Sequence, residues 1–189
     1  MKPVPLGFSS TKGQLLVAAP PLDDPNFHHT VVFMLEHNDD GAVGVVLNRP
    51  GGGDEFVELP GWEDVATPPA VIFYGGPVET DGFVAVAKVQ EPDESAWSPL
   101  SESLGTVDLT RLPEHVAERF EAVRIFRGYS GWSSGQLDQE LAMGGWIVVP
   151  SEPDDVFSEQ PASLWREVLR RQGGRLAWIA NAPDDLSAN

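Results

Sequence analysis

The sequence of 189 residues predicts one α+β domain, and three observations support this prediction. Short apolar runs alternate with turn residues, which is typical of strands joined by hairpins. Two clear stretches, and one shorter one, have the apolar spacing of helices. Strands and helices do not alternate regularly, so repeated strand–helix–strand units are not expected. A chain of this length normally forms one domain that needs no disulfide or metal to fold.

Nine short apolar runs predict the strands. The run 29–37 is apolar on both faces, so we expect this strand to be covered on both sides. Residues 38–41, Asn-Asp-Asp-Gly, have turn chemistry and return the chain antiparallel into 43–48. In chain order, the predicted strands are 14–19, 29–37, 43–48, 70–74, 82–89, 104–109, 123–126, 146–149 and 175–180.

Two stretches predict clear helices, 133–143 and 161–172. In the first, Ser133 and Gln136 have the spacing of a capping box, in which each side chain satisfies the other residue's backbone amide. The second opens on a proline, which suits a first helical turn. The apolar face of the second helix consists of Leu164, Trp165, Val168 and Leu169.

The remaining segments predict short turns, a loop and the chain ends. We expect helical turns at 59–65, with Trp62 packed inward, and after Pro113, with Val116 and Phe120 on one face. The polar, proline-broken stretch 90–100 predicts a long surface loop. Loose termini are expected at 1–12 and 181–189.

The charge balance narrows the classes of partner. Acidic residues number 29 against 12 basic ones, which gives a net charge of -17. This field repels phosphate backbones and anionic lipids, so direct binding to nucleic acid or to a membrane is disfavoured and a protein partner is expected. The first ten residues lack the apolar core of a signal peptide, and no run approaches the length of a membrane span. A cytoplasmic protein is therefore predicted.

Motifs for metal, cofactor and nucleophilic chemistry are missing. The chain has no cysteine, and the pair Asp23–Asp24 before Pro25 reads as turn chemistry. His28 and His29 are adjacent, so on a strand they point to opposite faces and do not share one ion. The serines near 130–134 lack the nucleophile-elbow pattern. We expect no catalytic residue, no metal site and no cofactor.

Two polar or glycine-rich segments are candidate binding sites. A buried valine-rich strand ends on Asn48, Arg49 and Pro50. Arg49 either pairs with a carboxylate such as Glu36 or Asp81, or binds an incoming carboxylate or phosphate. Asn48 either orients Arg49 or ties the loop to the backbone. The second segment, 75–77 (Gly-Gly-Pro), forms either a tight turn or a nest of backbone amides for an anion.

A third candidate, 128–132 (Gly-Tyr-Ser-Gly-Trp), is expected between a strand and the helix 133–143. Either the helix N-terminus offers amides to an anion, or the glycines turn the chain while the two aromatic rings plug the edge of the core. Together, the candidate ligand- or partner-binding residues are Asn48, Arg49, Gly75, Gly76, Pro77, Tyr129, Ser130, Gly131 and Trp132.

Four blocks of the sequence resemble the YqgE/AlgH family: GQLLVAAPPLDDPNFHHTVVFMLEHNDDGAVGVVLNRP, YGGPV, GYSGWSSGQLDQEL and WIVVP. They occur in the family's order, and the resemblance covers nearly the whole chain from Gly13. It implies a compact α+β domain with an irregular, mixed and partly split sheet, in a cytosolic bacterial protein. It implies no established activity, although members are often labelled transcriptional regulators or are associated by name with alginate regulation.

The family's recurring positions carry over to this chain, with one departure. Ser133-Ser134 stands where similar proteins often have Gly-Pro or Gly-Ala, which keeps a helix start but alters the turn. The resemblance implies recurring roles for Asp24, Pro25, Phe27, Thr30, Glu36, His37, Gly41, Gly44, Asn48, Arg49, Pro50, Gly75, Gly76, Pro77, Gly128, Tyr129, Gly131, Trp132, Gly135, Gln136 and Leu137.

Two functions are compatible with these observations. The first is a non-enzymatic regulatory or protein-interaction module, which rests on the missing catalytic constellation and the acidic surface. The alternative is an anion- or carboxylate-binding protein or enzyme that uses the Asn48–Arg49 tip with the 75–77 and 128–132 segments. The alternative requires these segments to converge on one cleft in which Arg49 has no closed ion pair.

Overall fold

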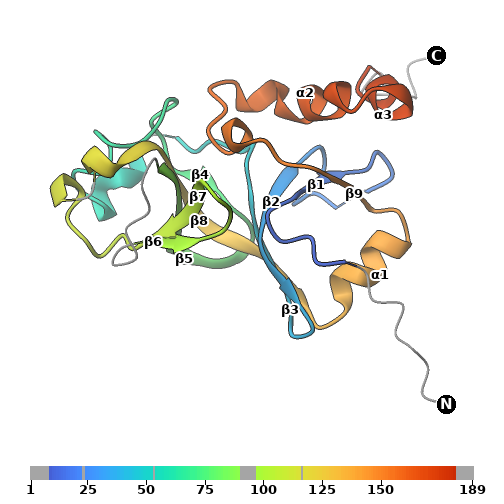
Figure 1. Cartoon of the computed structure of the whole chain (residues 1–189), viewed down its shortest axis with the longest axis horizontal. Helices are drawn as coiled ribbons and strands as arrows, with labels where there is room; N and C mark the ends of the chain where they lie inside the picture. The colour runs from blue at the N-terminus through green and yellow to red at the C-terminus, as the bar shows by residue number, and fades with distance from the viewer. Residues whose placement is uncertain (1–8, 23, 53, 90–96, 116, 182–189) are drawn as a thin grey trace.

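One curled sheet organises the computed structural model, which describes residues 9–22, 24–52, 54–89, 97–115 and 117–181 (Figure 1). Within these residues nine strands follow the order β6-β7-β5-β8-β3-β2-β1-β9, and β4 pairs with β8. The strands are β1 (Leu15–Ala18), β2 (Val31–Asn38), β3 (Gly41–Val46), β4 (Phe73–Tyr74), β5 (Val78–Val89), β6 (Trp97–Pro99), β7 (Leu104–Val107), β8 (Phe120–Ser133) and β9 (Trp146–Val149).

The pairing confirms the predicted fold class. Every neighbouring pair is antiparallel except β4 and β8, which run parallel, so the sheet is mixed but largely antiparallel. The α-helices are α1 (Gln136–Ala142), α2 (Leu164–Arg171) and α3 (Gly174–Ile179). Short 3-10 turns lie at η1 (Asp54–Glu58), η2 (Pro113–His115), η3 (Ala117–Arg119), η4 (Pro153–Asp155) and η5 (Pro161–Ser163).

Strand β8 is the element that joins the two halves of the sheet seen in Figure 1. Its first part pairs with β5, and its last residues, Ser130–Ser133, pair with β3. The register against β5 shifts between Val78 and Phe83, opposite Gly128, whose φ of 65° lies in the left-handed region. A glycine in this conformation marks a bulge that bends a strand, so Gly128 helps the sheet curl.

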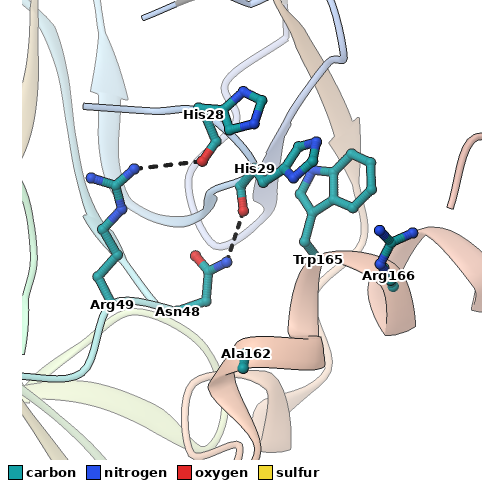
Figure 2. A pocket seen from close by; sticks show the side chains of 7 residues that line it. All are labelled: His28, His29, Asn48, Arg49, Ala162, Trp165 and Arg166. Carbon is teal, nitrogen blue, oxygen red and sulfur yellow. Dashed lines mark hydrogen bonds between the residues drawn. The ribbon is translucent and has the colours of Figure 1, made fainter. Parts of the chain in front are cut away.

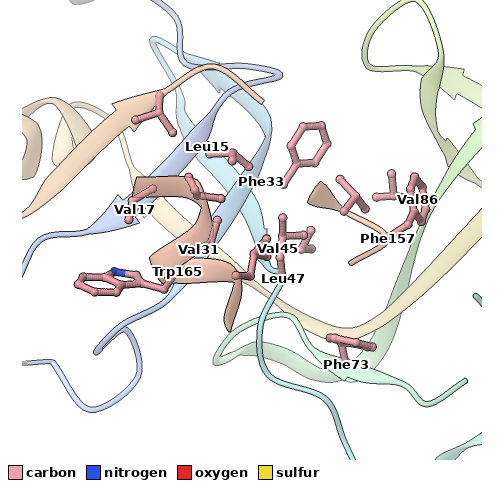
Figure 3. Packing of buried hydrophobic residues seen from close by; sticks show 14 of the residues in the cluster. Leu15, Val17, Val31, Phe33, Val45, Leu47, Phe73, Val86, Phe157 and Trp165 are labelled. Carbon is pink, nitrogen blue, oxygen red and sulfur yellow. The ribbon is translucent and has the colours of Figure 1, made fainter. Parts of the chain in front are cut away.

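Strand β2 is buried on both faces, as its sequence predicts. Val31 and Phe33 belong to a core beneath helix α2, whereas Val32 and Met34 belong to a second core beneath α1. Figure 3 shows the first of these cores, with the side chain of Trp165 reaching from α2 towards the strands. The predicted apolar face of α2 is confirmed, because all four of its residues are buried.

Three predictions about elements are wrong. The predicted strand 175–180 falls on helix α3 (Gly174–Ile179), because Leu176 and Ile179 pack on the first core at helical spacing. Residues 97–99, predicted as loop, form the edge strand β6, where a proline is tolerated. The segment 128–132 is not a loop between strand and helix, because it lies inside β8.

The predicted capping box at α1 is only half formed. Gln136 Oε1 accepts a hydrogen bond from the Ser133 amide at 3.0 Å, which is one half of the box. The Ser133 hydroxyl donates to the same oxygen instead of accepting from an amide of the helix. The residue that precedes the helix is Gly135, with φ of 69°. Trp62 is buried, as expected, in a series of turns that follows η1.

Some expectations fall outside the described residues. These are the loop at 90–96, position 116 in the predicted turn after Pro113, and the termini at 1–8 and 182–189. Thr11, within the predicted N-terminal arm, is buried, and its amide donates to His37 Nδ1 at 3.2 Å.

Candidate functional site

Asn48 ties the loop before β2 to the end of β3. Its Nδ2 donates to the His29 carbonyl at 2.8 Å, and its Oδ1 accepts from the Val31 amide at 3.0 Å. One side chain therefore pairs with a backbone acceptor and a backbone donor, just beyond the last backbone bond between the two strands, from the Leu47 amide to the Val31 carbonyl at 2.8 Å. Of the two predicted roles for Asn48, the structure shows the attachment of a loop to the backbone.

Replacing Asn48 with alanine should destabilise the protein by about 1–3 kcal/mol, because two partly buried backbone groups lose their partner. Urea unfolding measures this loss as a lower midpoint at an unchanged slope. Asn38→Ala is a suitable control, since Asn38 accepts one exposed bond, from the Asp40 amide. An equal loss in both variants would contradict the assigned role of Asn48.

Arg49 is held by backbone carbonyls. Its Nη2 donates to the carbonyl of Pro25 at 3.3 Å and to that of His28 at 3.5 Å. Figure 2 shows the second of these bonds. In the part of the chain that the structure describes, no carboxylate forms an ion pair with Arg49. Glu36, one of the predicted partners, binds Lys12 Nζ at 2.8 Å, and this bond lowers the pKa of Glu36. The predicted pairing of Arg49 with Glu36 is therefore wrong.

A pocket of about 240 Å³ opens between Arg49 and helix α2 (Figure 2). Three elements build it: the loop before β2, the end of β3 and the segment from η5 into α2. The residues that line it are His28, His29, Asn48, Arg49, Ala162, Trp165 and Arg166. None of these described residues is acidic, and two of them are arginines, so the lining is basic in a protein whose net charge is -17.

The two histidines and Trp165 form a stack of rings in this pocket. The ring centroids of His28 and His29 are 4.0 Å apart, and those of His29 and Trp165 are 4.3 Å apart. The prediction that the histidines point to opposite faces is wrong, because they precede β2 and His29 has φ of 52°. A positive φ is uncommon in residues other than glycine and here turns the ring towards α2.

Helix α2 supplies the other wall of the pocket. Trp165 Nε1 donates to the Ala18 carbonyl at 3.0 Å, which fixes the indole against β1. Arg166 Nη1 donates to the Ala180 carbonyl at 2.5 Å, and the guanidinium carbon lies 5.9 Å from the centre of the Trp165 ring. Both side chains are thus positioned by backbone of other elements.

Two residues of the Gly-Gly-Pro segment, with Arg49, line a second and smaller pocket. This pocket, of about 140 Å³, is lined by Asn26, Arg49, Tyr74, Gly76 and Pro77. Gly75 is inserted between β3 and β8, since its amide donates to the Arg127 carbonyl at 2.8 Å and its carbonyl accepts from Val46. A Cβ at Gly75 would lie 2.3 Å from the Gly128 oxygen. The glycine at 75 is thus needed for close backbone packing, and its amide is already bonded.

The residues of the 128–132 segment lie in different environments along β8. Ser130 is buried, and its hydroxyl donates to the Gly75 carbonyl at 3.0 Å, while Tyr129 is half-buried against the first core. Gly131 is exposed on β8. Trp132 lies in the second core, where its Nε1 donates to Glu140 at 2.9 Å. Among the predicted site residues, Asn48 and Arg49 line the larger pocket, and Arg49, Gly76 and Pro77 line the smaller one. Residues 128–132 line neither pocket, so the three predicted segments do not converge on one cleft.

Sequence reasoning missed four residues of the larger pocket, namely His28, His29, Trp165 and Arg166. Trp165 was predicted as a core residue, and it is buried. One feature of the sequence could have indicated Arg166. It lies off the apolar face of its helix and next to Trp165, a residue of the face that packs against the sheet. Nothing in the sequence indicates which loop this arginine faces.

The fold and the pocket define a small α+β protein with a basic pocket at the point where a loop, a strand end and a helix meet. The chain belongs to the AlgH-like family, DUF179, whose model matches residues 15–177. It is 50% identical over 186 residues to a UPF0301 protein of Streptomyces coelicolor, covering 96% of each chain. The resemblance stated from the four sequence blocks is confirmed.

Two solved structures share the fold. A crystal structure of a Corynebacterium diphtheriae protein matches with a TM-score of 0.86 and 29% identity, covering 93% of this chain and 94% of that one. The solution structure of the AlgH protein from Pseudomonas aeruginosa matches with a TM-score of 0.71 and 30% identity, covering 97% and 98%. Among the residues described here, no helix is long and apolar enough to cross a membrane.

Proposed function

We propose that this protein is a non-enzymatic binding protein that takes a small carboxylate or phosphate in the pocket beside Arg49. The observation that supports the proposal is the environment of Arg49. Arg49 is partly buried as a residue, and its guanidinium is bonded to two carbonyls, which fix its position but do not neutralise its charge. An anion that enters the pocket supplies the missing counter-charge.

The lining suits binding better than catalysis. A guanidinium offers planar donors that match a carboxylate or phosphate. Asn48 is already committed to the backbone, and none of the described lining residues is a serine, threonine, lysine or carboxylate. Nucleophilic catalysis needs such a group beside its base, so the two histidines face no nucleophile within this lining.

Thermal unfolding of the protein against acetate, citrate, phosphate, sulfate and nucleotides tests the proposal. A ligand at about 100 times its dissociation constant adds about 2.7 kcal/mol. For a domain of this size that raises the midpoint by about 5–11 °C. Arg49→Gln should abolish the rise, measured against the variant's own midpoint, and Arg175→Gln, an exposed change on α3, should keep it.

Two results would contradict the proposal. One is a midpoint that no anion of the panel raises, and the other is a rise of equal size in wild type and Arg49→Gln. The first result would favour the second candidate function, the regulatory or protein-interaction module.

A separate surface supports that second candidate. An apolar groove of about 250 Å³ lies beside the C-terminal end of α1, lined by Pro21, Leu22, Glu140, Met143, Gly144 and Gly145. Met143 is 79% exposed, which is unusual for a large apolar side chain and typical of adaptable contact surfaces. A protein partner fits this groove better than nucleic acid does, given the acidic charge balance. The regulatory role and the cytoplasmic location stay predictions.

A further inference from the structure

We infer that the free edge of strand β9, together with the groove beside α1, binds an extended segment of a partner protein that carries basic and apolar side chains. The segment adds to the sheet as a further strand next to β9. This surface is separate from the anion pocket, so the inference does not depend on anion binding at Arg49. It gives the second candidate function a mode of recognition.

The hydrogen-bond pattern leaves one side of β9 unpaired. Strand β9 is the last strand of the sheet, beyond β1 (Figure 1). Just before it, the Gly145 carbonyl accepts from the Ala19 amide at 3.0 Å. Bonded pairs alternate in an antiparallel ladder, so the amides and carbonyls of Trp146 and Val148 face away from β1. In the described part of the chain, these outward groups have no backbone partner.

Strand β9 also lacks the features that usually block an edge. Val148 is 38% exposed, and its side chain lies on the α1 face of the sheet with that of Trp146, because side chains two residues apart share a face. The strand contains no charged residue and no proline, which are common means of blocking an edge. The opposite edge strand, β6, ends on Pro99, which lacks an amide donor. Of the two edges that the structure describes, β9 is therefore the one suited to strand addition.

The groove offers apolar contacts to alternate side chains of the added strand. Gly144 and Gly145 line it and directly precede β9, so the groove adjoins the start of the edge. Its apolar lining includes Leu22 and the exposed Met143. The side chains of a strand alternate between the two faces of a sheet. Those on the α1 face meet the groove and Val148, while backbone bonds to β9 hold the segment in register.

Charge favours a basic segment. Glu140 lines the groove with its carboxylate fixed by neighbouring side chains. The carboxylate accepts from Nε1 of Trp132 at 2.9 Å, from Nε1 of Trp146 at 2.8 Å and from Nε2 of Gln136 at 3.0 Å. All three donors are neutral, and no ion pair to Glu140 occurs among the described residues. A lysine or arginine of the bound segment supplies the counter-charge, and the net charge of -17 attracts basic chains from a distance. The same net charge disfavours pairing of β9 with a second copy of this protein.

Selection from a displayed library of random decapeptides on the full chain tests the inference. We expect the enriched peptides to have apolar residues at alternate positions and more lysine and arginine than the unselected library. A synthetic copy of one enriched peptide is then titrated by calorimetry. Replacing its basic residues with glutamate should weaken binding at least about tenfold, because like charges then face each other. Added salt should reduce this difference.

Variants of β9 and the groove locate the binding site. Val148→Pro removes an outward amide that makes no bond to β1, and proline is tolerated at such edge positions. It should weaken the peptide at least about tenfold, because the ring blocks the added strand and one donor is lost. Val148→Thr is the matched control, since it keeps the amide and the branched shape, and it should keep the affinity. Glu140→Gln keeps an oxygen for the two indole groups but removes the charge, so it should reduce the preference for basic over acidic peptides.

Several results would overturn the inference. These are a library without enriched peptides, enriched peptides without an excess of basic residues, equal affinity for wild type and Val148→Pro, and an unchanged charge preference in Glu140→Gln. Sedimentation equilibrium tests the other occupant, because a wild-type dimer that Val148→Pro converts to a monomer would assign the edge to a second copy and overturn the inference. Circular dichroism checks the folding of each variant. The thermal response to anions should be the same in Val148→Pro as in wild type, so failure of either proposal leaves the other intact.

Discussion

Arg124→Met is expected to cost about 3–5 kcal/mol of stability, a size typical of breaking a buried charged network. Arg124 is 1% exposed, and its guanidinium donates to the carbonyls of residues 67–69, Val156 and Ser158 at 3.1–3.3 Å. The guanidinium carbon also lies 4.2 Å from the centre of the Phe73 ring. Burial lowers the pKa of Arg124 to about 10, so the side chain is still a cation at neutral pH.

This arginine differs from a buried ion pair, which apolar residues can sometimes replace without loss. Its acceptors are backbone carbonyls, and no substitution at Arg124 removes them. For a domain of this size the loss lowers the unfolding midpoint by about 6–20 °C. Arg124→Lys, with fewer donors and no fork, should fall between wild type and Arg124→Met. A loss below about 1 kcal/mol, or equal stability of the lysine variant, would contradict the assigned role.

Arg171→Met is expected to cost about 2–4 kcal/mol, because it leaves the buried carboxylate of Asp155 without its cation. Asp155 is 5% exposed, and its two oxygens accept from Arg171 at 2.5 and 2.6 Å. This bond raises the pKa of Arg171. Because the folded state raises the pKa of this base, the contact with Asp155 stabilises the protein at neutral pH. This contribution is lost only when the pH rises far enough to deprotonate Arg171.

A double variant separates the cost of leaving the Asp155 carboxylate unpaired from the cost of losing the other contacts of Arg171. Asp155→Asn combined with Arg171→Met removes the charge while keeping most of the volume, so the double variant should be more stable than Arg171→Met alone. Urea unfolding of the four proteins in the cycle gives the coupling between the two residues. Additive losses would contradict the buried pair.

The elements with a strong periodic pattern were predictable from the sequence. Strand β2 has apolar residues on both faces, and α2 has four apolar residues on one side. For each element, only one type of secondary structure buries all of these apolar side chains. The short segments were not predictable in this way. The pattern of residues 174–179 is too short to distinguish a helix from a strand. Packing against α2 decides for the helix, and this contact is not visible in the sequence.

The candidate site was predictable only in part, for a related reason. Asn48 and Arg49 are visible because polar residues end a buried strand. The segment 128–132 reads as a loop because glycine usually breaks strands, yet here glycines permit the bulge of β8 and the close approach of Gly75. The pocket also depends on Arg166, which is distant in sequence from Arg49 and is brought near it by tertiary packing.

Nuclear magnetic resonance of the 20.5 kDa protein, titrated with succinate, tests anion binding at Arg49 most directly. The proposal predicts saturable shifts of the Arg49 Nε–H, the His28 and His29 rings and the Trp165 indole, with no response at Met143 in the α1 groove. The same titration of Arg49→Gln should leave the signals of the two histidine rings and the Trp165 indole in place. Shifts that are absent, that do not saturate, or that gather at the α1 groove would contradict the pocket as the binding site.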